Sequence, residues 1–520
     1  MTAGGDILIG IDAGTSVVKS VAFDMLGAQV GAAARPNRYA TRPDGAAVQS
    51  MEGTWEDCAA TLRALGEAVP NLARRCAAIA VTAQGDGTWL VGPGDEAVTE
   101  AWLWLDARAA PVVDRLRGTP ADRERFAVSG AGLNACQMSA QLLHMKSIMP
   151  QAVEAAETAM HAKDWLYLNL TGVRATDPTE GGFTFGDFRT RAYDDRVIEA
   201  LGLGAERRLL PPILDGSRET HPLMDGAAAR TGLRAGTPVS LGFVDVVCTA
   251  LGGGIRTGGE GAGCTILGST GMHMRAVDQD EVVLGDDLTG YVMPLPIPRM
   301  VAQIQSNMAA TLNLDWLMDV AADLLGEFGD APPRSELVAR IDPWLKAAAP
   351  GRVLYHPYIS AAGERGPFVN PAARAGFAGL SSVHRFPNLV RAVAEGLGLA
   401  GHDCYEAMGG VPPEVRLTGG AARSPALRGI LGAALGVPVR PSRREEAGAA
   451  GAAMMAAVAI GAYPDMDSCI ADWVAPTLGP AEHPDEELAR RYADLLGPYR
   501  AVREAMPPVW AALANGGAAA

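Results

Sequence analysis

The feature that most restricts the fold of this chain is a β-hairpin with a small, hydroxyl-bearing turn, which occurs twice. The first copy is "ILIGIDAGTSVVKSVAFD", with strands expected over residues 7–12 and 17–24. The second copy, "GAGCTILGSTGMHMRAV" at residues 261–277, follows roughly 255 residues later. A hairpin repeated at that distance predicts two related domains, and the cleft where they face each other is the expected ligand site.

The rest of the chain alternates between helix-like and strand-like segments. Apolar spacing predicts helices over residues 55–69, 389–408 and 425–435, and short apolar runs predict strands over 77–82, 238–243 and 415–420. The 520 residues exceed what one hydrophobic core serves. We therefore expect an α/β protein with an N-terminal domain over residues 1–248, a C-terminal domain over 249–470, and a helical appendage with a tail over 471–520.

Composition excludes some classes of partner. The net charge of −15 argues against broad nucleic-acid binding, which needs a basic face, although backbone amides could still bind one small phosphorylated ligand. Residues 447–464 carry no charge and approach the length of a membrane span, but they are mostly Ala and Gly, so we expect a tightly packed helix inside a domain. Seven scattered cysteines without a CxxC pair, and an N-terminus without a basic segment, predict a cytoplasmic protein without a disulfide framework or secretory signal.

The two hairpin turns have the chemistry of anion-binding sites. The first turn combines a glycine, two hydroxyls, a lysine and a carboxylate: Gly14, Thr15, Ser16, Lys19 and Asp12. The glycine lets backbone amides converge on an anion, the lysine adds a point charge, and the carboxylate could hold Mg²⁺. The second turn offers Gly268, Ser269 and Thr270 in the same context. An ordinary hairpin turn is the alternative for each, and neither a P-loop nor a dinucleotide-binding glycine motif is present.

Asp245 lies where a strand ends and a helix begins, in "LGFVDVVCTALGGG". It could cap the helix, which local sequence alone favours. It could also act as a general base at the mouth of a cleft, where the helix N-terminus would keep it ionised.

Two further segments suit small ligands. Gln84, Asp86 and Asp106 follow apolar strands near the flat ring of Trp104, an arrangement that suits a polyol because its hydroxyls need fixed acceptors and its carbons need a surface. Solvated loop residues beside a core tryptophan are the alternative. In "LTGGAARSPALRG", two glycines between a strand and a helix, Gly419 and Gly420, would let a flat ring such as adenine lie close, or simply form a strand-to-helix turn.

Taken in order, these segments resemble the FGGY carbohydrate kinases within the actin-like ATPase superfamily, over about residues 7–465. The matching motifs are "GIDAGTSVVKSVAFD", "TAQGDG", "WLWLDARA", "KDWLYLNLTGVRATDPTEG", "GFVDVVCTALGGG", "GCTILGSTG" and "LTGGAARSPALRGILGAALGVPV" with "EEAGAAGAAMMAA". The resemblance implies two RNase H-like domains flanking a central cleft in which ATP and a sugar or polyol meet.

The resemblance also implies roles for individual residues. Asp245 would take the proton of the attacking hydroxyl, and Asp12 and Asp245 would lie near Mg²⁺. Thr15, Ser16 and Lys19, with Gly14 in the turn, would face the transferring phosphoryl group. The ATP phosphates would lie at Gly268, Ser269 and Thr270, and the nucleoside would be surrounded by Thr311, Gly419, Gly420 and Ser424.

The substrate loop departs from two known patterns. Glycerol kinases of this family carry Gln-Arg-Glu and xylulose kinases Gln-Met-His, whereas this chain has Gln84, Gly85 and Asp86. A roomier pocket still lined with acceptors implies a linear polyol slightly longer than glycerol, with Asn134 and Gln137 as further contacts. A kinase for a pentulose or pentitol, and a non-kinase actin-like ATPase, are the alternatives. The expected partners are the polyol and ATP, without nucleic acid or membrane, and a homodimer is left open.

Overall fold

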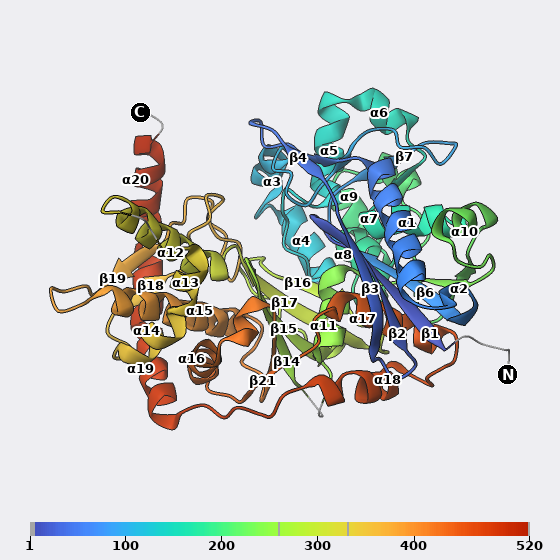
Figure 1. The fold of residues 1–520 in the computed structure, drawn as a ribbon. Coiled ribbons are helices and arrows are strands. Elements are labelled where there is room, and N and C mark those ends of the chain that lie inside the picture. The colour runs from blue at the N-terminus through green and yellow to red at the C-terminus, as the bar shows by residue number, and fades with distance from the viewer. Residues whose placement is uncertain (1–5, 258–260, 330–331, 518–520) are drawn as a thin grey trace.

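Two mixed sheets of six strands each form the centres of two domains (Figure 1). The computed structural model describes residues 6–257, 261–329 and 332–517. The order in the first sheet is β12 (His221–Pro222), β13 (Pro238–Leu241), β6 (Cys76–Ala83), β1 (Ile7–Ala13), β2 (Val17–Asp24) and β3 (Gln29–Pro36). The order in the second sheet is β16 (Tyr291–Pro294), β17 (Met300–Asn307), β15 (Gly271–Asp278), β14 (Gly263–Leu267), β20 (Val415–Thr418) and β21 (Val439–Pro441).

Five strands of each sheet share one topology, and the sixth strands differ: β12 pairs with β13 in the first sheet, and β16 pairs with β17 in the second. β1 pairs antiparallel with β2, β2 pairs antiparallel with β3, and β6 and β13 follow β1 in parallel. In the second sheet β14, β15 and β17 form the antiparallel part, and β20 and β21 follow β14 in parallel. The repeated hairpin is thus the start of a repeated domain, as the sequence predicts. β1, β6 and β13 run parallel to one another, and so do β14, β20 and β21, so the carboxyl ends of each group lie at one edge of its sheet. The loops that follow these strands are therefore the expected place for ligands.

Successive side chains of β1 pack on opposite faces of the first sheet. Ile7, Ile9 and Ile11 pack with helices α1 (Met51–Ala68) and α7 (Ala162–Thr171) in one buried cluster. Leu8 belongs instead to the cluster between the domains, together with residues of α11 (Asp245–Gly253) and α17 (Ala447–Ala459). This alternation is the period of two that a strand buried on both faces requires.

Helices α11 and α17 hold corresponding positions in the two domains and pack against each other in the interface (Figure 1). α11 follows β13, the last strand of the first sheet, and α17 follows β21. Their backbones approach so closely that a Cβ on Gly252 would overlap the Ala447 carbonyl, and one on Gly10 of β1 would overlap that of Ala449. The Ala and Gly composition of residues 447–464 therefore reflects close packing, as expected. No helix among the described residues is long and apolar enough to cross a membrane.

The second sheet is covered by α12 (Thr311–Gly326), α15 (Phe386–Ala407) and α16 (Pro425–Leu435), which share one cluster with Leu267 and Leu417. The chain then continues through α18 (Met466–Trp473), α19 (Glu486–Ala505) and α20 (Pro507–Gly517). The C-terminal region is helical as predicted, and it is packed: Tyr492, Tyr499 and Trp510 are buried. The last three residues of the expected tail, and the first five of the N-terminal stretch, lie outside the described residues.

The remaining helices and strands are short. The helices are α2 (Leu72–Arg75), α3 (Ala110–Leu116), α4 (Pro120–Ser129), α5 (Met138–Ile148), α6 (Pro150–Ala155), α8 (Phe183–Phe185), α9 (Asp195–Ala200), α10 (Asp225–Thr231), α13 (Arg334–Ala339) and α14 (Ile341–Ala347). The strands are β4 (Tyr39–Thr41), β5 (Ala47–Gln49), β7 (Trp89–Val91), β8 (Ala101–Trp102), β9 (Thr158–Met160), β10 (Gly186–Asp187), β11 (Ala192–Tyr193), β18 (Leu354–His356) and β19 (Gly376–Ala378).

Candidate active site

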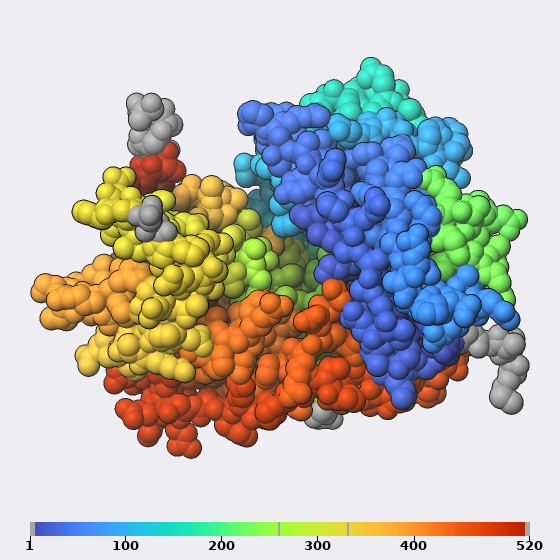
Figure 2. Space-filling view, viewed as in Figure 1, coloured from blue at the N-terminus to red at the C-terminus, as the bar shows by residue number. Residues whose placement is uncertain are grey.

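Both hairpin turns and Asp245 open onto one cavity between the two domains. The cavity has a volume of about 230 Å³ and is lined by Thr15 from the turn after β1, Thr270 from the turn after β14, and Asp245 from the start of α11. In the space-filling view a notch separates the blue N-terminal domain from the yellow and orange C-terminal domain, with green chain at its base (Figure 2). The expectation that the two turns share one cleft beside Asp245 is therefore confirmed.

The first turn is fixed by side chains of the predicted polyol site. Thr15 Oγ1 donates a hydrogen bond to Gln84 Oε1 at 2.8 Å and accepts one from Trp104 Nε1 at 2.8 Å. Gln84 Nε2 in turn donates to Gln49 Oε1 at 2.9 Å. Thr15, Gln84 and Trp104, which the sequence proposed separately, thus form one hydrogen-bonded unit on the cavity wall, next to Asp86.

Asp245 is the first residue of α11, and Val244 before it is the N-cap. The Val244 N–H donates to Thr179 Oγ1 at 2.9 Å, which fixes where the helix begins. The N-cap position thus belongs to Val244, which has no polar side chain, and Asp245 lines the cavity. The helix-cap role favoured by local sequence is therefore wrong, and the carboxylate is free to face the cavity.

Burial and the neighbouring Asp12 carboxylate raise the pKa of Asp245 to about 8. Burial also raises the pKa of Asp12 to about 6, against the opposing effect of Lys19. The expectation that the helix N-terminus keeps Asp245 ionised is wrong for the protein alone, because desolvation and a like charge outweigh the Val246 N–H. A cation beside both carboxylates would reverse these shifts.

The pair Asp12 and Asp245 fits a magnesium site that a nucleotide completes. Mg²⁺ is usually held by one or two carboxylates together with substrate phosphates and water. Gly448 at the start of α17 leaves the space, since a Cβ there would lie 2.5 Å from Asp12 Oδ2. No group of three or more metal-ligating side chains occurs among residues 6–257, 261–329 and 332–517. The protein thus offers two carboxylates, and phosphate oxygens would have to supply the rest.

The other polar groups of the first turn face different surroundings. Ser16 is exposed. Lys19 Nζ forms an ion pair with Glu446 Oε2 at 2.9 Å, with side chains 37% and 20% exposed. Because Glu446 directly precedes α17, this ion pair joins the first turn to the N-terminal end of that interdomain helix.

The second turn rests on the beginning of α12. Thr311 donates to the Gly268 carbonyl through both its hydroxyl, at 2.8 Å, and its N–H, at 3.0 Å. The Ala310 N–H donates to the Ser269 carbonyl at 2.7 Å. Thr311 therefore lies directly against the turn that the sequence assigns to ATP phosphates.

Gly419 and Gly420 line a separate cavity of about 570 Å³, formed by the loops after β20 and β21. Gly419 has a φ of +88°, and a Cβ there would lie 2.5 Å from the Leu267 carbonyl oxygen, so the position requires glycine. Ser424 does not line this cavity. Its hydroxyl caps α16 by accepting from the Leu427 N–H at 3.1 Å and donates to Asp342.

Three predicted substrate residues lie outside the 230 Å³ cavity. Asp106 is 1% exposed and its carboxylate accepts from the Ala47 N–H at 2.9 Å and pairs with Arg108 at 2.6 Å. Gln137 Oε1 accepts from the Asn134 N–H at 3.2 Å within their own turn, and Asn134 Nδ2 also donates to the hydroxyl of Tyr291, which lines the 230 Å³ cavity, at 3.1 Å. Asp106 and Asn134 instead line an adjoining cavity of about 350 Å³, which shares Trp104 and Arg365 with the first.

Sequence reasoning missed two charged residues of the 230 Å³ cavity, Glu180 and Arg365. Arg365 comes from the C-terminal domain, and its Nε donates to Ser306 Oγ at 2.9 Å. Glu180 comes from the Gly-rich segment after α7, which contains a short π-helix over Pro178–Gly182. Arg365 belongs to none of the motifs quoted above. Glu180 lies within "KDWLYLNLTGVRATDPTEG", to which no site role was assigned, so its carboxylate was a signal that could have been followed.

Two related domains with paired phosphate-type turns and an aspartate between them define a sugar-kinase type of fold. Comparison with family models agrees: the FGGY carbohydrate kinase N-terminal domain matches residues 7–252, and the C-terminal domain matches residues 263–460. The chain therefore belongs to the FGGY family of carbohydrate kinases. As such a kinase it uses ATP as phosphoryl donor.

Individual relatives narrow the comparison. The chain is 61% identical over 512 residues to the erythritol kinase of Brucella abortus (strain 2308), covering 98% of each protein. It is 27% identical over 500 residues to the autoinducer-2 kinase of Yersinia pestis (strain Pestoides F), covering 90% of this chain and 88% of that protein. The crystal structure of gluconate kinase from Lactobacillus acidophilus superposes with a TM-score of 0.87 at 20% identity, over 98% of this chain and 99% of that one. The predicted fold of two RNase H-like domains around a cleft is confirmed.

Proposed function

We propose that this enzyme transfers the terminal phosphoryl group of ATP to a terminal hydroxyl of erythritol. The observation that carries the proposal is the single cavity in which Asp245 lies between the two hairpin turns. The 61% identity to an erythritol kinase supports the choice of polyol. The space at Gly85 is filled by Glu180 and Val244, so it adds no room for substrate, whereas Gln84 and Asp86 on the cavity wall agree with a polyol.

In the proposed reaction Asp245 accepts the proton of the attacking hydroxyl. The hydroxyl oxygen bonds to the terminal phosphorus while the bond from that phosphorus to the bridging oxygen breaks, leaving ADP. Mg²⁺ held by Asp12 and Asp245 would neutralise charge on the transferring phosphoryl group. Asp245 must be unprotonated to act, so its raised pKa in the protein alone means that a bound cation favours the active form.

The remaining residues position the two substrates. We assign the first turn, with Gly14, Thr15, Ser16 and Lys19, to the transferring phosphoryl group. We assign the second turn, with Gly268, Ser269 and Thr270, to the ATP phosphates. We assign the loop after β20 and the start of α12, with Gly419, Gly420 and Thr311, to the nucleoside, and Ser424 supports that loop from outside the 570 Å³ cavity by capping α16. Gln84, Asp86 and Trp104 bind the polyol. Asp106, Asn134 and Gln137 lie outside the 230 Å³ cavity and support its wall through hydrogen bonds to neighbouring segments. Closure of the domains would exclude water as a competing acceptor.

The test is ADP release with each of erythritol, glycerol, xylitol and xylulose. The proposal expects release that depends on a polyol and has its highest kcat/KM with erythritol. A preference for xylitol or xylulose would favour a pentitol or pentulose kinase. Release that no polyol changes would favour an ATPase of another class.

The proposal also covers the domain limits, the cellular location and the oligomeric state of the enzyme. We propose domain limits at residues 1–248, 249–470 and 471–520, and we place the enzyme in the cytoplasm, where ATP is available and seven free cysteines, all buried, stay reduced. A homodimer stays a prediction. Light scattering would distinguish a mass of one 54.0 kDa chain from that of two.

A further inference from the structure

Glu180 places a second carboxylate in the wall of the polyol cavity, beside Asp86. It is 1% exposed, and its Oε1 accepts from the Asp86 N–H at 3.2 Å. Asp86 has a φ of +55°, a left-handed conformation that non-glycine residues rarely adopt. The hydrogen bond from Glu180 therefore supports the conformation that orients Asp86, whose buried Oδ1 has no hydrogen-bond partner among the described residues.

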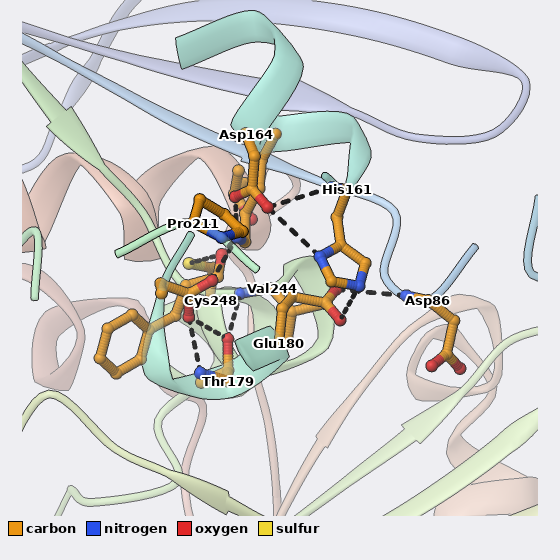
Figure 3. Close-up of polar contacts among 12 residues, drawn as sticks. Asp86, His161, Asp164, Thr179, Glu180, Pro211, Val244 and Cys248 are labelled. Atoms are coloured by element: carbon orange, nitrogen blue, oxygen red, sulfur yellow. Dashed lines mark hydrogen bonds and ion pairs between the residues drawn. The ribbon is translucent and has the colours of Figure 1, made fainter. Parts of the chain in front are cut away.

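Glu180 contacts in turn a buried chain of ionisable side chains (Figure 3). His161 Nε2 lies 3.3 Å from Glu180 Oε2, and His161 Nδ1 lies 3.2 Å from Asp164 Oδ2. Asp164 Oδ1 pairs with Lys163 Nζ at 2.6 Å, and Lys163 also pairs with Asp177. All of these side chains are at most 3% exposed. Such a set of buried charges costs stability to desolvate, and it fixes the position of the Glu180 carboxylate.

Gly85 provides the space that Glu180 occupies. A Cβ at this position would lie 2.9 Å from Glu180 Oε1 and 2.5 Å from Val244 Cγ2. The missing side chain in the substrate loop is thus matched to the carboxylate behind it. The same carboxyl group retains acceptor capacity, because its two oxygens offer about four lone pairs. Oε1 accepts one hydrogen bond, from the Asp86 N–H, and Oε2 has no hydrogen-bond partner among the described residues.

We propose that Glu180 is a specificity-determining residue, which binds a hydroxyl of the polyol together with Asp86, and that His161 is its positioning residue. This inference rests on the proposed phosphorylation of erythritol and names the group that reads the polyol. A carboxylate that accepts from a hydroxyl discriminates against an analogue that lacks it, because the acceptor is then left buried without a partner.

The experiment measures kcat/KM for erythritol and for two analogues that each lack one hydroxyl, butane-1,2,3-triol and butane-1,2,4-triol. We expect Glu180→Gln to raise the KM for erythritol by about 10- to 100-fold with a smaller change in kcat. We also expect it to reduce the preference for erythritol over at least one analogue. The matched control is Glu395→Gln, which alters a buried carboxylate bound by Arg391 away from the cavity and should leave these ratios unchanged.

Two further variants test the positioning of Glu180. Gly85→Ala should reproduce the loss of discrimination, because its Cβ displaces the carboxylate. His161→Gln, which keeps a donor directed at Glu180, should retain more discrimination than His161→Asn.

The outcomes separate this inference from the proposed function. If the wild-type enzyme turns over erythritol and Glu180→Gln keeps both analogue ratios within about twofold of wild type, the role of Glu180 is refuted while the proposed function stands. If the wild-type enzyme shows no erythritol-dependent turnover, the proposed function fails first and the inference falls with it.

Discussion

Removing the Thr15 hydroxyl should uncouple the first phosphate turn from the polyol site. Thr15→Val keeps the shape of the side chain but deletes the hydrogen bonds to Gln84 Oε1 and from Trp104 Nε1, both 2.8 Å long. Each neutral hydrogen bond contributes about 0.5–1.5 kcal/mol net, and an acceptor left buried without a partner costs about 1–3 kcal/mol. Gln84 is 3% exposed, so water cannot readily replace the lost donor.

Trp104 is less buried than Gln84, so water can accept the hydrogen bond of its indole N–H in the variant. The free-energy cost of losing that hydrogen bond is therefore left out of the sum. The remaining loss is about 2–3 kcal/mol, which corresponds to a fall in kcat/KM for the polyol of roughly 30- to 150-fold. Thr15→Ser keeps the hydroxyl and is the matched control, expected within about threefold of wild type.

The assay is steady-state ADP release with the polyol and ATP varied separately. Loss of the hydrogen-bonded unit predicts that Thr15→Val raises the KM for the polyol. If the KM for ATP alone rises and the polyol KM matches that of Thr15→Ser, the hydroxyl serves only the nucleotide and the reasoning is refuted.

Two other predictions concern residues outside the chemical step. Asp106→Asn should lower the free energy of unfolding by about 1–3 kcal/mol with little change in polyol KM, because its carboxylate holds the Ala47 N–H and Arg108; a large KM increase with an unchanged Tm would give it a substrate role instead. Burial lowers the pKa of His273 from 6.5 to about 4, so between these pH values the unfolded chain binds a proton that the native protein does not. The contribution of His273 to the free energy of unfolding should therefore be complete above pH 6.5 and should fall by roughly 3 kcal/mol as the pH drops toward 4. Denaturant titrations at a series of pH values should show that the free energy of unfolding of His273→Gln changes less between pH 6.5 and 4 than that of the wild type. An equal change in both proteins would contradict the role given to His273.

The repeated architecture could be predicted because its signals are local. Strands over 7–12 and 17–24 are separated by a turn of small residues, and alternation along each strand is visible in the sequence. In the structure β1 runs one residue further, to Ala13, and β2 has the expected limits. The helix expected over 425–435 is α16 (Pro425–Leu435), bounded by Ser424 and Gly436 as caps. The helix expected from residue 55 begins at Met51, since Ser50 caps it by accepting from the Gly53 N–H.

The site was only partly predictable because its wall is assembled from distant segments. Thr15, Asp245 and Thr270 each follow a strand end, where motif and position agree. Arg365 comes from the opposite domain, and Glu180 lies in a short π-helix whose contacts with Asp86 and His161 join segments distant in the chain, which periodicity does not encode. Asp106 shows the opposite error: a carboxylate at a strand end looked like a substrate acceptor, but its hydrogen bonds hold the backbone of a neighbouring strand.

The turnover of Asp245→Asn, measured together with its nucleotide affinity, tests the central claim most directly. Asparagine keeps the size of the side chain and cannot accept the hydroxyl proton. If Asp245 is the base, kcat should fall by about 10²–10⁴-fold while calorimetry shows ATP binding within a few-fold of wild type. Turnover within about threefold of wild type would show that the proton leaves by another route and that the cleft works differently from the account given above.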